Sequence, residues 1–386
     1  MSVDPEEVKA MSNRNTFVRR FAAGIAAVAA LAAAGCGATT TGGDGEQEAA
    51  SVEEGFTIGL LLPESKTARY EKFDRPYFEE AVAELCPNCE VSYQNADQDV
   101  SKQQSQAEAM LTEGVDVLVL DAVDAEAAGS IVQQAKGQGV PVVAYDRLAQ
   151  GGVDYYVSFD NKTVGRVQGE ALIEGMEKAG TAGDGPIVMI NGSPTDPNAA
   201  DFKAGAHEIL DGQVEIGAEY DTADWSPDKA QQQMEQAITS IGADNISGVY
   251  SANDGMAAGI IAALKSAGVD EMPPITGQDA ELAGIQRIIS GDQYMTVYKA
   301  IRPEAEVAAA MAVAAATGEE YQGTDEHPLT EATDGAGETV PAVLLEPIAV
   351  TAENIEDTVI SDGFYTVEEI CTDEYADTDL CKGAGA

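Results

Sequence analysis

Val115-Asp-Val-Leu-Val-Leu120 and Val140-Pro-Val-Val-Ala-Tyr145 are two short, almost continuously apolar runs, and they decide the fold. A strand that is apolar at nearly every position has to be buried on both faces of its sheet, as in a parallel sheet covered by helices. Between the two runs, Ala125 to Gly137 has helical periodicity. Strand, helix and strand in succession predict an α/β fold with right-handed crossovers.

The same alternation continues along the rest of the chain. Further strand-like runs lie at residues 56–62, 90–94, 154–159, 186–191, 213–219, 247–252, 273–277 and 293–299. The helix-like stretches include Ser101 to Glu113, Asn161 to Lys178, Pro227 to Ile241 and Gly255 to Ala267. This number of strands exceeds one compact sheet of ordinary size, so we predict two doubly wound lobes. The first crossover is expected at Tyr156 to Asp160. Asn161, Asp254 and Asp279 stand just before helical runs, where a helix N-cap is the alternative to a functional role, and their common position at the same end of their strands favours the functional role.

Residues 1–35 have the pattern of a secretory signal peptide. Three arginines precede an apolar stretch, Phe21 to Ala34, which is too short to span a membrane. The stretch ends in small residues before Cys36 and resembles the lipobox of bacterial lipoproteins, although Ala33 stands where those proteins more often have Leu. We expect lipidation at Cys36, and the alternative is a secreted protein with a free Cys36.

Residues 36–55 are expected to join the lipidated cysteine to the folded part. They contain too few apolar side chains to order themselves, which predicts a flexible tether and a domain that starts near Phe56. Residues 1–10 are acidic, unlike the start of a signal peptide, so translation is expected to begin at Met11.

Charge and cysteine content limit the partners and the compartment. The net charge of -46 excludes nucleic acid and anionic membrane surfaces as partners and argues against an anionic ligand. Four further cysteines are expected to pair after export, Cys86 with Cys89 in a small structural loop and Cys371 with Cys381 around a C-terminal loop. A zinc site formed by the same four cysteines is the alternative.

The residues needed for catalysis are not found in the sequence. It has no GxxxxGK[ST] phosphate loop, no GxGxxG turn and no GxSxG elbow, and its two histidines, His207 and His327, lie in a helical stretch and a polar loop. We therefore expect that the protein is not an enzyme and that it has no catalytic residue and no cofactor. Asn95, Asp97 and Asp99 have a spacing that calcium can use, but helix capping is the simpler interpretation, so no metal is expected.

Polar side chains follow strand after strand. Asp146-Arg147 comes directly after the run that ends at Tyr145, and the same pattern gives Asn191, Asn253-Asp254, Gln278-Asp279 and Lys299. In open α/β sheets, ligands bind beyond the carboxyl ends of the strands, so we expect these groups to converge. Carboxylates, amides, an arginine and a lysine form a suitable cage for a neutral polyhydroxylated ligand.

Six segments resemble the D-xylose-binding proteins of bacterial ABC sugar importers, which have the type I periplasmic-binding fold. They are residues 142–147 (VVAYDR), 156–161 (YVSFDN), 192–199 (GSPTDPNA), 251–254 (SAND), 276–287 (TGQDAELAGIQR) and 295–299 (MTVYK). The resemblance runs from about Phe56 to Tyr365. It implies two Rossmann-like lobes with parallel sheets joined by three hinge strands, one formed by residues 56–160 and 300–340 and the other by residues 161–299 and 341–386.

The resemblance also implies the residues that line a sugar cleft: Arg69, Tyr70, Asp146, Arg147, Asp196, Asn198, Trp225, Asn253, Asp279 and Lys299. Tyr70 and Trp225 would cover the two faces of a pyranose ring. Family members often have Trp at the position of Tyr70, which leaves another aldopyranose or a pentose open beside D-xylose.

The implied role is that of a monomeric extracytoplasmic lipoprotein that hands its sugar to ABC permease subunits and touches the membrane only through its anchor. A sugar receptor for chemotaxis or a sensor kinase is the alternative. A transcription regulator would need a basic DNA-binding helix ahead of Phe56, where a signal peptide and an acidic tether stand instead.

Overall fold

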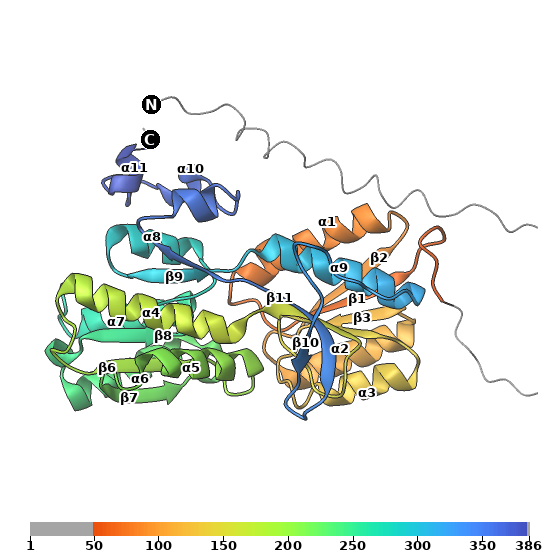
Figure 1. The fold of residues 1–386 in the computed structure, drawn as a ribbon, viewed down its shortest axis with the longest axis horizontal. Coiled ribbons are helices and arrows are strands. Elements are labelled where there is room, and N and C mark those ends of the chain that lie inside the picture. The colour runs from red at the N-terminus through yellow and green to blue at the C-terminus, as the bar shows by residue number, and fades with distance from the viewer. Residues whose placement is uncertain (1–48, 384–386) are drawn as a thin grey trace, which may run out of the picture. The chain divides into compact units, whose positions relative to one another are not determined.

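The computed structural model describes residues 49–383, so the predicted signal peptide, Met11 and Cys36 lie outside the described residues. This part of the chain forms two α/β lobes, as predicted (Figure 1). None of the helices in residues 49–383 combines the length and the apolarity that a membrane crossing requires.

The first lobe is built on a seven-stranded sheet with the order β10-β11-β5-β4-β3-β1-β2. All neighbours are parallel except β10 and β11. The strands are β1 (Thr57–Leu62), β2 (Glu90–Asn95), β3 (Val117–Leu120), β4 (Val142–Tyr145), β5 (Tyr155–Phe159), β10 (Thr330–Thr333) and β11 (Thr339–Leu345).

Helices cover both faces of this sheet, which explains the continuous apolar runs. Every residue of β3 and β4 is buried. One face of the sheet packs against α1 (Arg75–Leu85) and α9 (Ile301–Thr317), and the strand side chains on that face form one core with these helices. The other face packs against α2 (Val100–Glu113) and α3 (Gly129–Gly137) in a second core (Figure 1).

The second lobe contains a parallel sheet with the order β7-β6-β8 and an antiparallel pair, β9 and β12. Its strands are β6 (Ile187–Asn191), β7 (Ile216–Asp221), β8 (Gly248–Ser251), β9 (Met295–Tyr298) and β12 (Ile348–Thr351). Its helices are α4 (Asn161–Ala179), α5 (Pro197–Leu210), α6 (Pro227–Ile241), α7 (Asp254–Ser266) and α8 (Leu282–Ser290), with the short 3-10 helices η4 (Ala223–Trp225) and η5 (Ala243–Asn245).

The segment 273–277, predicted as a strand, does not form a regular strand. It makes a single parallel bridge, Val249 to Ile275, although its backbone also accepts hydrogen bonds from β9. Pro273 and Pro274 have no N–H to donate, so a regular ladder cannot extend through the segment.

The chain passes between the lobes three times, as the resemblance implied. It passes from β5 to α4, from β9 to α9, and from β11 to β12 (Figure 1). The expected boundary between residues 340 and 341 is wrong, because it falls inside β11. Ala342 to Leu345 pair in parallel with β5, so the third passage begins only after Leu345.

The end of the predicted tether is part of the first lobe. The N–H of Ala50 donates to the carbonyl oxygen of Ala316 at 3.0 Å, and the Asn88 side chain donates to the carbonyl oxygen of Glu53 at 2.9 Å. Residues 50–55 are therefore bound to the domain, and the tether ends earlier than residue 55.

Both expected disulfides are present. Cys86 is bonded to Cys89 and Cys371 to Cys381, which removes these four thiols as zinc ligands. Asp99 accepts from the N–H of Lys102 at 3.0 Å and caps α2, as the capping interpretation predicted. The described part of the chain contains no cluster of His, Cys, Asp and Glu side chains that would hold a metal.

The helix N-caps are not Asn161, Asp254 and Asp279 but residues one or two positions away. Asp160 caps α4 by accepting from Thr163 N–H at 3.0 Å, and Asn253 caps α7 by accepting from Met256 N–H at 2.9 Å. Glu281 occupies the N-cap position of α8. The apolar runs end close to the observed helix starts, but the sequence does not show which of two adjacent polar residues turns back onto the helix.

The C-terminal segment folds against the start of the first lobe. It contains η6 (Glu356–Ile360), α10 (Val367–Ile370) and α11 (Asp379–Gly383). Phe364 stacks on Phe73 of the π-helix η3 (Tyr70–Asp74), with ring centroids 3.9 Å apart. Lys72 lies 4.4 Å from the centre of the Tyr365 ring and 3.3 Å from a Glu369 carboxylate oxygen.

Candidate ligand-binding site

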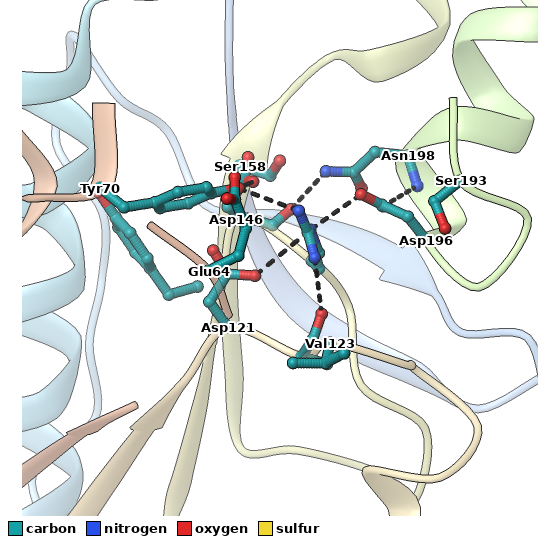
Figure 2. A network of polar contacts seen from close by, with 12 residues as sticks. Glu64, Tyr70, Asp121, Val123, Asp146, Ser158, Ser193, Asp196 and Asn198 are labelled. Carbon is teal, nitrogen blue, oxygen red and sulfur yellow. Dashed lines mark hydrogen bonds and ion pairs between the residues drawn. The ribbon is translucent and has the colours of Figure 1, made fainter. Parts of the chain in front are cut away.

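One cavity between the lobes is lined by all ten residues that the resemblance implied. Its volume is about 290 Å³ when the open space at its mouth is included. The predicted lining residues are Arg69, Tyr70, Asp146, Arg147, Asp196, Asn198, Trp225, Asn253, Asp279 and Lys299, and each is at most 9% exposed. Tyr70, Asp146, Asp196 and Asn198 are seen together in Figure 2.

Strand ends and helix starts bring these side chains together. Asp146 and Arg147 follow β4, Asn253 follows β8, and Lys299 follows β9. Asp196 is the N-cap of α5. Asp146 and Asp279 have φ values of 57° and 85°, and a left-handed backbone in residues other than glycine is concentrated at functional sites.

Two strand-end residues that the sequence singled out do not reach the cavity. Asn191 donates to side chains of β7, Glu219 at 2.9 Å and Asp221 at 3.3 Å. The Asp254 carboxylate accepts from the N–H of Glu281 and from the Gln293 and Thr296 side chains. Both residues support the second lobe from within.

Arg69 is the centre of a buried ion cluster at one end of the cavity. Its guanidinium lies 2.7 Å from Asp74, 2.7 Å from Glu304 and 3.3 Å from Asp146. Lys299 lies 3.3 Å from Asp279 and 3.8 Å from Asp146. Asp146 therefore faces two cations at once.

The electrostatics of Asp146 follow from these contacts. Burial would raise the pKa of this carboxyl, but the charges of Arg69, Lys299 and Arg147 outweigh burial and lower the pKa to about 2. Asp146 is consequently an anion, and a strong hydrogen-bond acceptor, throughout the physiological pH range.

Arg147 links the two lobes. Its Nε lies 2.8 Å from Asp196 of the second lobe, and its Nη2 donates to the Tyr70 hydroxyl at 3.1 Å. Asn198, also from the second lobe, donates to the Asp146 carbonyl oxygen at 3.0 Å. Burial raises the pKa of Asp196, and the charge of Arg147 opposes this.

Trp225 belongs both to the cavity and to the core of the second lobe. Trp225 lies in the short turn η4, is 7% exposed and packs edge-on to Phe202 with ring centroids 6.3 Å apart. Its indole N–H donates to Asp196 at 3.1 Å. The ring is thus held in place from two sides.

Two lining residues, Thr67 and Phe202, were not predicted, and a third, Gln278, was predicted by the strand-end pattern but not by the resemblance. Phe202 is four residues after Asn198 on α5, and helix periodicity puts such residues on one face, so this signal was available. Gln278 precedes Asp279 directly. Glu304 and Asp74, which support Arg69 from behind, carry no comparable signal, because only the fold brings them to it.

Gly192 sets the position of Trp225, which gives a direct test. A Cβ at Gly192 would lie 2.1 Å from the indole ring, so Gly192→Ala is expected to displace the ring and to lower stability by about 1–3 kcal/mol through overpacking. A shifted emission of this single tryptophan, together with a lower melting temperature, would verify the contact. Gly137→Ala is the control because a methyl group at Gly137 would meet nothing within 4 Å, and an unchanged emission in Gly192→Ala would contradict the packing.

The chain matches the family model described as "Periplasmic binding protein domain" over residues 58–320. The chain belongs to the periplasmic binding protein family. Periplasmic binding proteins are extracytoplasmic solute receptors and not enzymes.

Its relatives include two proteins named for D-xylose. The D-xylose-binding periplasmic proteins of Haemophilus influenzae and Escherichia coli are each 37% identical to it, over 81% of this chain and 91% and 92% of theirs. A solute-binding protein of Clostridium phytofermentans with bound β-D-glucose has a TM-score of 0.70 and 30% identity, covering 81% of this chain and 99% of its own. A carbohydrate transporter solute-binding protein of Chloroflexus aurantiacus in complex with D-glucose has a TM-score of 0.71 and 27% identity, covering 82% and 98%.

Proposed function

We propose that this protein captures D-xylose in the cavity between its lobes and delivers it to the permease of an ABC importer. The observation that carries the proposal is the convergence of the ten expected side chains on one cavity. The two relatives at 37% identity, both named for D-xylose binding, support this choice of sugar.

The lining chemistry suits a neutral sugar. Asp146, Asp196 and Asp279 can accept hydrogen bonds from hydroxyl groups, Arg69, Arg147 and Lys299 can donate to hydroxyl and ring oxygens, and Asn198 and Asn253 can do both. Tyr70, Phe202 and Trp225 supply aromatic surface for the apolar faces of a pyranose. Since charges of both signs are paired across the cavity, a ligand needs no net charge.

Calorimetry of the chain without residues 1–35 tests the proposal. D-xylose is expected to bind one to one and more tightly than glucose, ribose, arabinose or galactose. If none of these sugars releases heat or raises the melting temperature at millimolar concentration, the protein is not a receptor for them.

We further propose that Cys36 carries a lipid anchor and that the sugar-binding body is a monomer. The lipobox-like sequence before Cys36 supports the anchor. Mass spectrometry of the mature N-terminus is expected to show an acylated cysteine, and Cys36→Ser is expected to move the protein from the membrane fraction to the soluble fraction. An unmodified Cys36 would contradict the anchor.

A further inference from the structure

Asp121, at the end of β3, is a buried carboxylate without a hydrogen-bond donor. The residue is 0% exposed, and neither carboxylate oxygen has a hydrogen-bond partner in the described structure. The Arg147 Nε lies 3.5 Å away, outside good hydrogen-bond geometry. An ionised carboxylate in such a place is costly, so its position beside Arg147 needs an explanation.

Asp121 and Asp196 compete for the same nitrogen of Arg147. Asp196, from the second lobe, lies 2.8 Å from Nε, whereas Asp121, from the same lobe as the arginine, lies 3.5 Å from it. The rest of the guanidinium donates to the first-lobe groups Tyr70 Oη and Ala122 O. With the lobes in contact, Asp196 is therefore the closer partner.

A ligand can reach the cavity only if the lobes separate, because the charged lining residues are at most 9% exposed. Separation takes Asp196 away with α5 and leaves Arg147 on the first lobe. A guanidinium that loses its counter-charge is strongly destabilised. Asp146 is already shared by Arg69 and Lys299, so Asp121 is the neighbouring carboxylate in a position to replace Asp196.

We propose that Asp121 is a positioning residue that holds Arg147 while the lobes are apart, and that it releases the arginine to Asp196 and takes up a proton from solvent when they close around the sugar. This rests on the proposed sugar-binding function and adds a proton linkage to it. Sugar affinity should then rise as pH falls, because the bound state holds more protons than the free state.

The surroundings of Asp121 favour its neutral form once the lobes have closed. Burial raises the pKa of this carboxyl, and the charge of Arg147 opposes this. Of the other charged groups that face it, Asp146 and Asp196 raise the pKa further and Arg69 lowers it. Before closure, contact with water and an Arg147 that is not shared with Asp196 would favour the carboxylate form of Asp121.

Calorimetry in two buffers of different ionisation enthalpy, at about pH 6 to 7, measures the proton directly. For the wild type, the apparent enthalpy of D-xylose binding is expected to differ between the buffers by an amount that corresponds to uptake of up to about one proton. The affinity for D-xylose is expected to fall by up to about tenfold for each unit by which the pH rises. Asp121→Asn is expected to bind D-xylose with a buffer-independent enthalpy and a flatter pH profile. The exposed Asp270→Asn should keep the wild-type uptake.

A second variant covers the case in which Asp121→Asn fails to fold. In Asp196→Asn the arginine has no carboxylate from the second lobe, so Asp121 should stay ionised and the uptake should vanish, although the sugar binds more weakly. Wild-type binding without proton uptake, or uptake that persists in Asp121→Asn, would overturn the inference while the receptor function stands. Absence of binding to any sugar would instead remove the function on which the inference rests.

Discussion

Arg69→Met is expected to lower the free energy of unfolding by about 3–5 kcal/mol, because it removes the cation from a buried cluster and leaves uncompensated charges. The three carboxylates that surround the guanidinium, Asp74, Asp146 and Glu304, are 1%, 3% and 0% exposed. Methionine keeps the unbranched apolar part of the side chain, so the lost charge accounts for most of the effect. Urea unfolding of the sugar-free protein measures the change.

The pH dependence of this deficit has a definite sign. Burial raises the pKa of the Glu304 carboxyl, and the charge of Arg69 opposes this. Without Arg69 that pKa is expected to lie further above its value in the unfolded chain, so the folded variant gains relative stability as Glu304 becomes protonated. The deficit is therefore expected to be largest at neutral pH and to shrink as the pH falls toward about 4.

Arg166→Met is the matched control for Arg69→Met. Arg166 pairs with Glu208 at 2.8 Å, but its side chain is 38% exposed, and a surface pair of this kind contributes about 0–1 kcal/mol. Equal stability losses for the two variants would show that the burial of the Arg69 cluster has no energetic consequence.

Trp225→Ala is expected to weaken sugar binding by at least about 100-fold, close to 2.7 kcal/mol, because a buried aromatic wall of the cavity is lost. The substitution is expected to lower the stability of the protein as well. Since the ring packs on Phe202 and Gly192 in the core of the second lobe, the variant should also lose about 3–5 kcal/mol of stability. Affinity therefore has to be measured well below the melting temperature of the variant.

Trp225→Phe separates the ring from its N–H. It retains an apolar face but cannot donate to Asp196, so a loss nearer to tenfold is expected. Trp225→Ala protein that is folded by circular dichroism and binds D-xylose as tightly as the wild type would show that the ring packs the core without touching the sugar.

The order of strands and helices could be predicted because it rests on local periodicity. Runs such as Val115 to Leu120 are buried on both faces wherever they lie in the sheet, so their pattern does not depend on their partners. The segment 273–277 shows the limit of this approach, since its strand-like composition cannot overcome two consecutive prolines. β10 was missed because its exposed residues have no apolar pattern over Thr330 to Thr333. β11 was missed although its sequence, TVPAVLL, is mostly apolar.

The lining of the cavity could be predicted largely through the resemblance, and its polar character from strand ends alone. The residues behind the lining could not. Glu304 is a charged residue of α9, and nothing in its local sequence shows that it is fully buried against Arg69. Asp121 follows a strand, as do many polar residues that have no function. Whether such a carboxylate is paired depends on contacts between separate segments of the chain, 235 residues apart for Arg69 and Glu304, and a single sequence holds no signal for them.

The stacking of Phe364 on Phe73 has a practical consequence for work with this protein. η3 carries Tyr70 and directly follows Arg69, so the C-terminal segment fixes one wall of the cavity without contributing a lining residue. Proteolytic clipping near the C-terminus, or reduction of the Cys371 to Cys381 bond, would loosen that wall. Preparations that differ only in the integrity of this segment would then give different apparent sugar affinities.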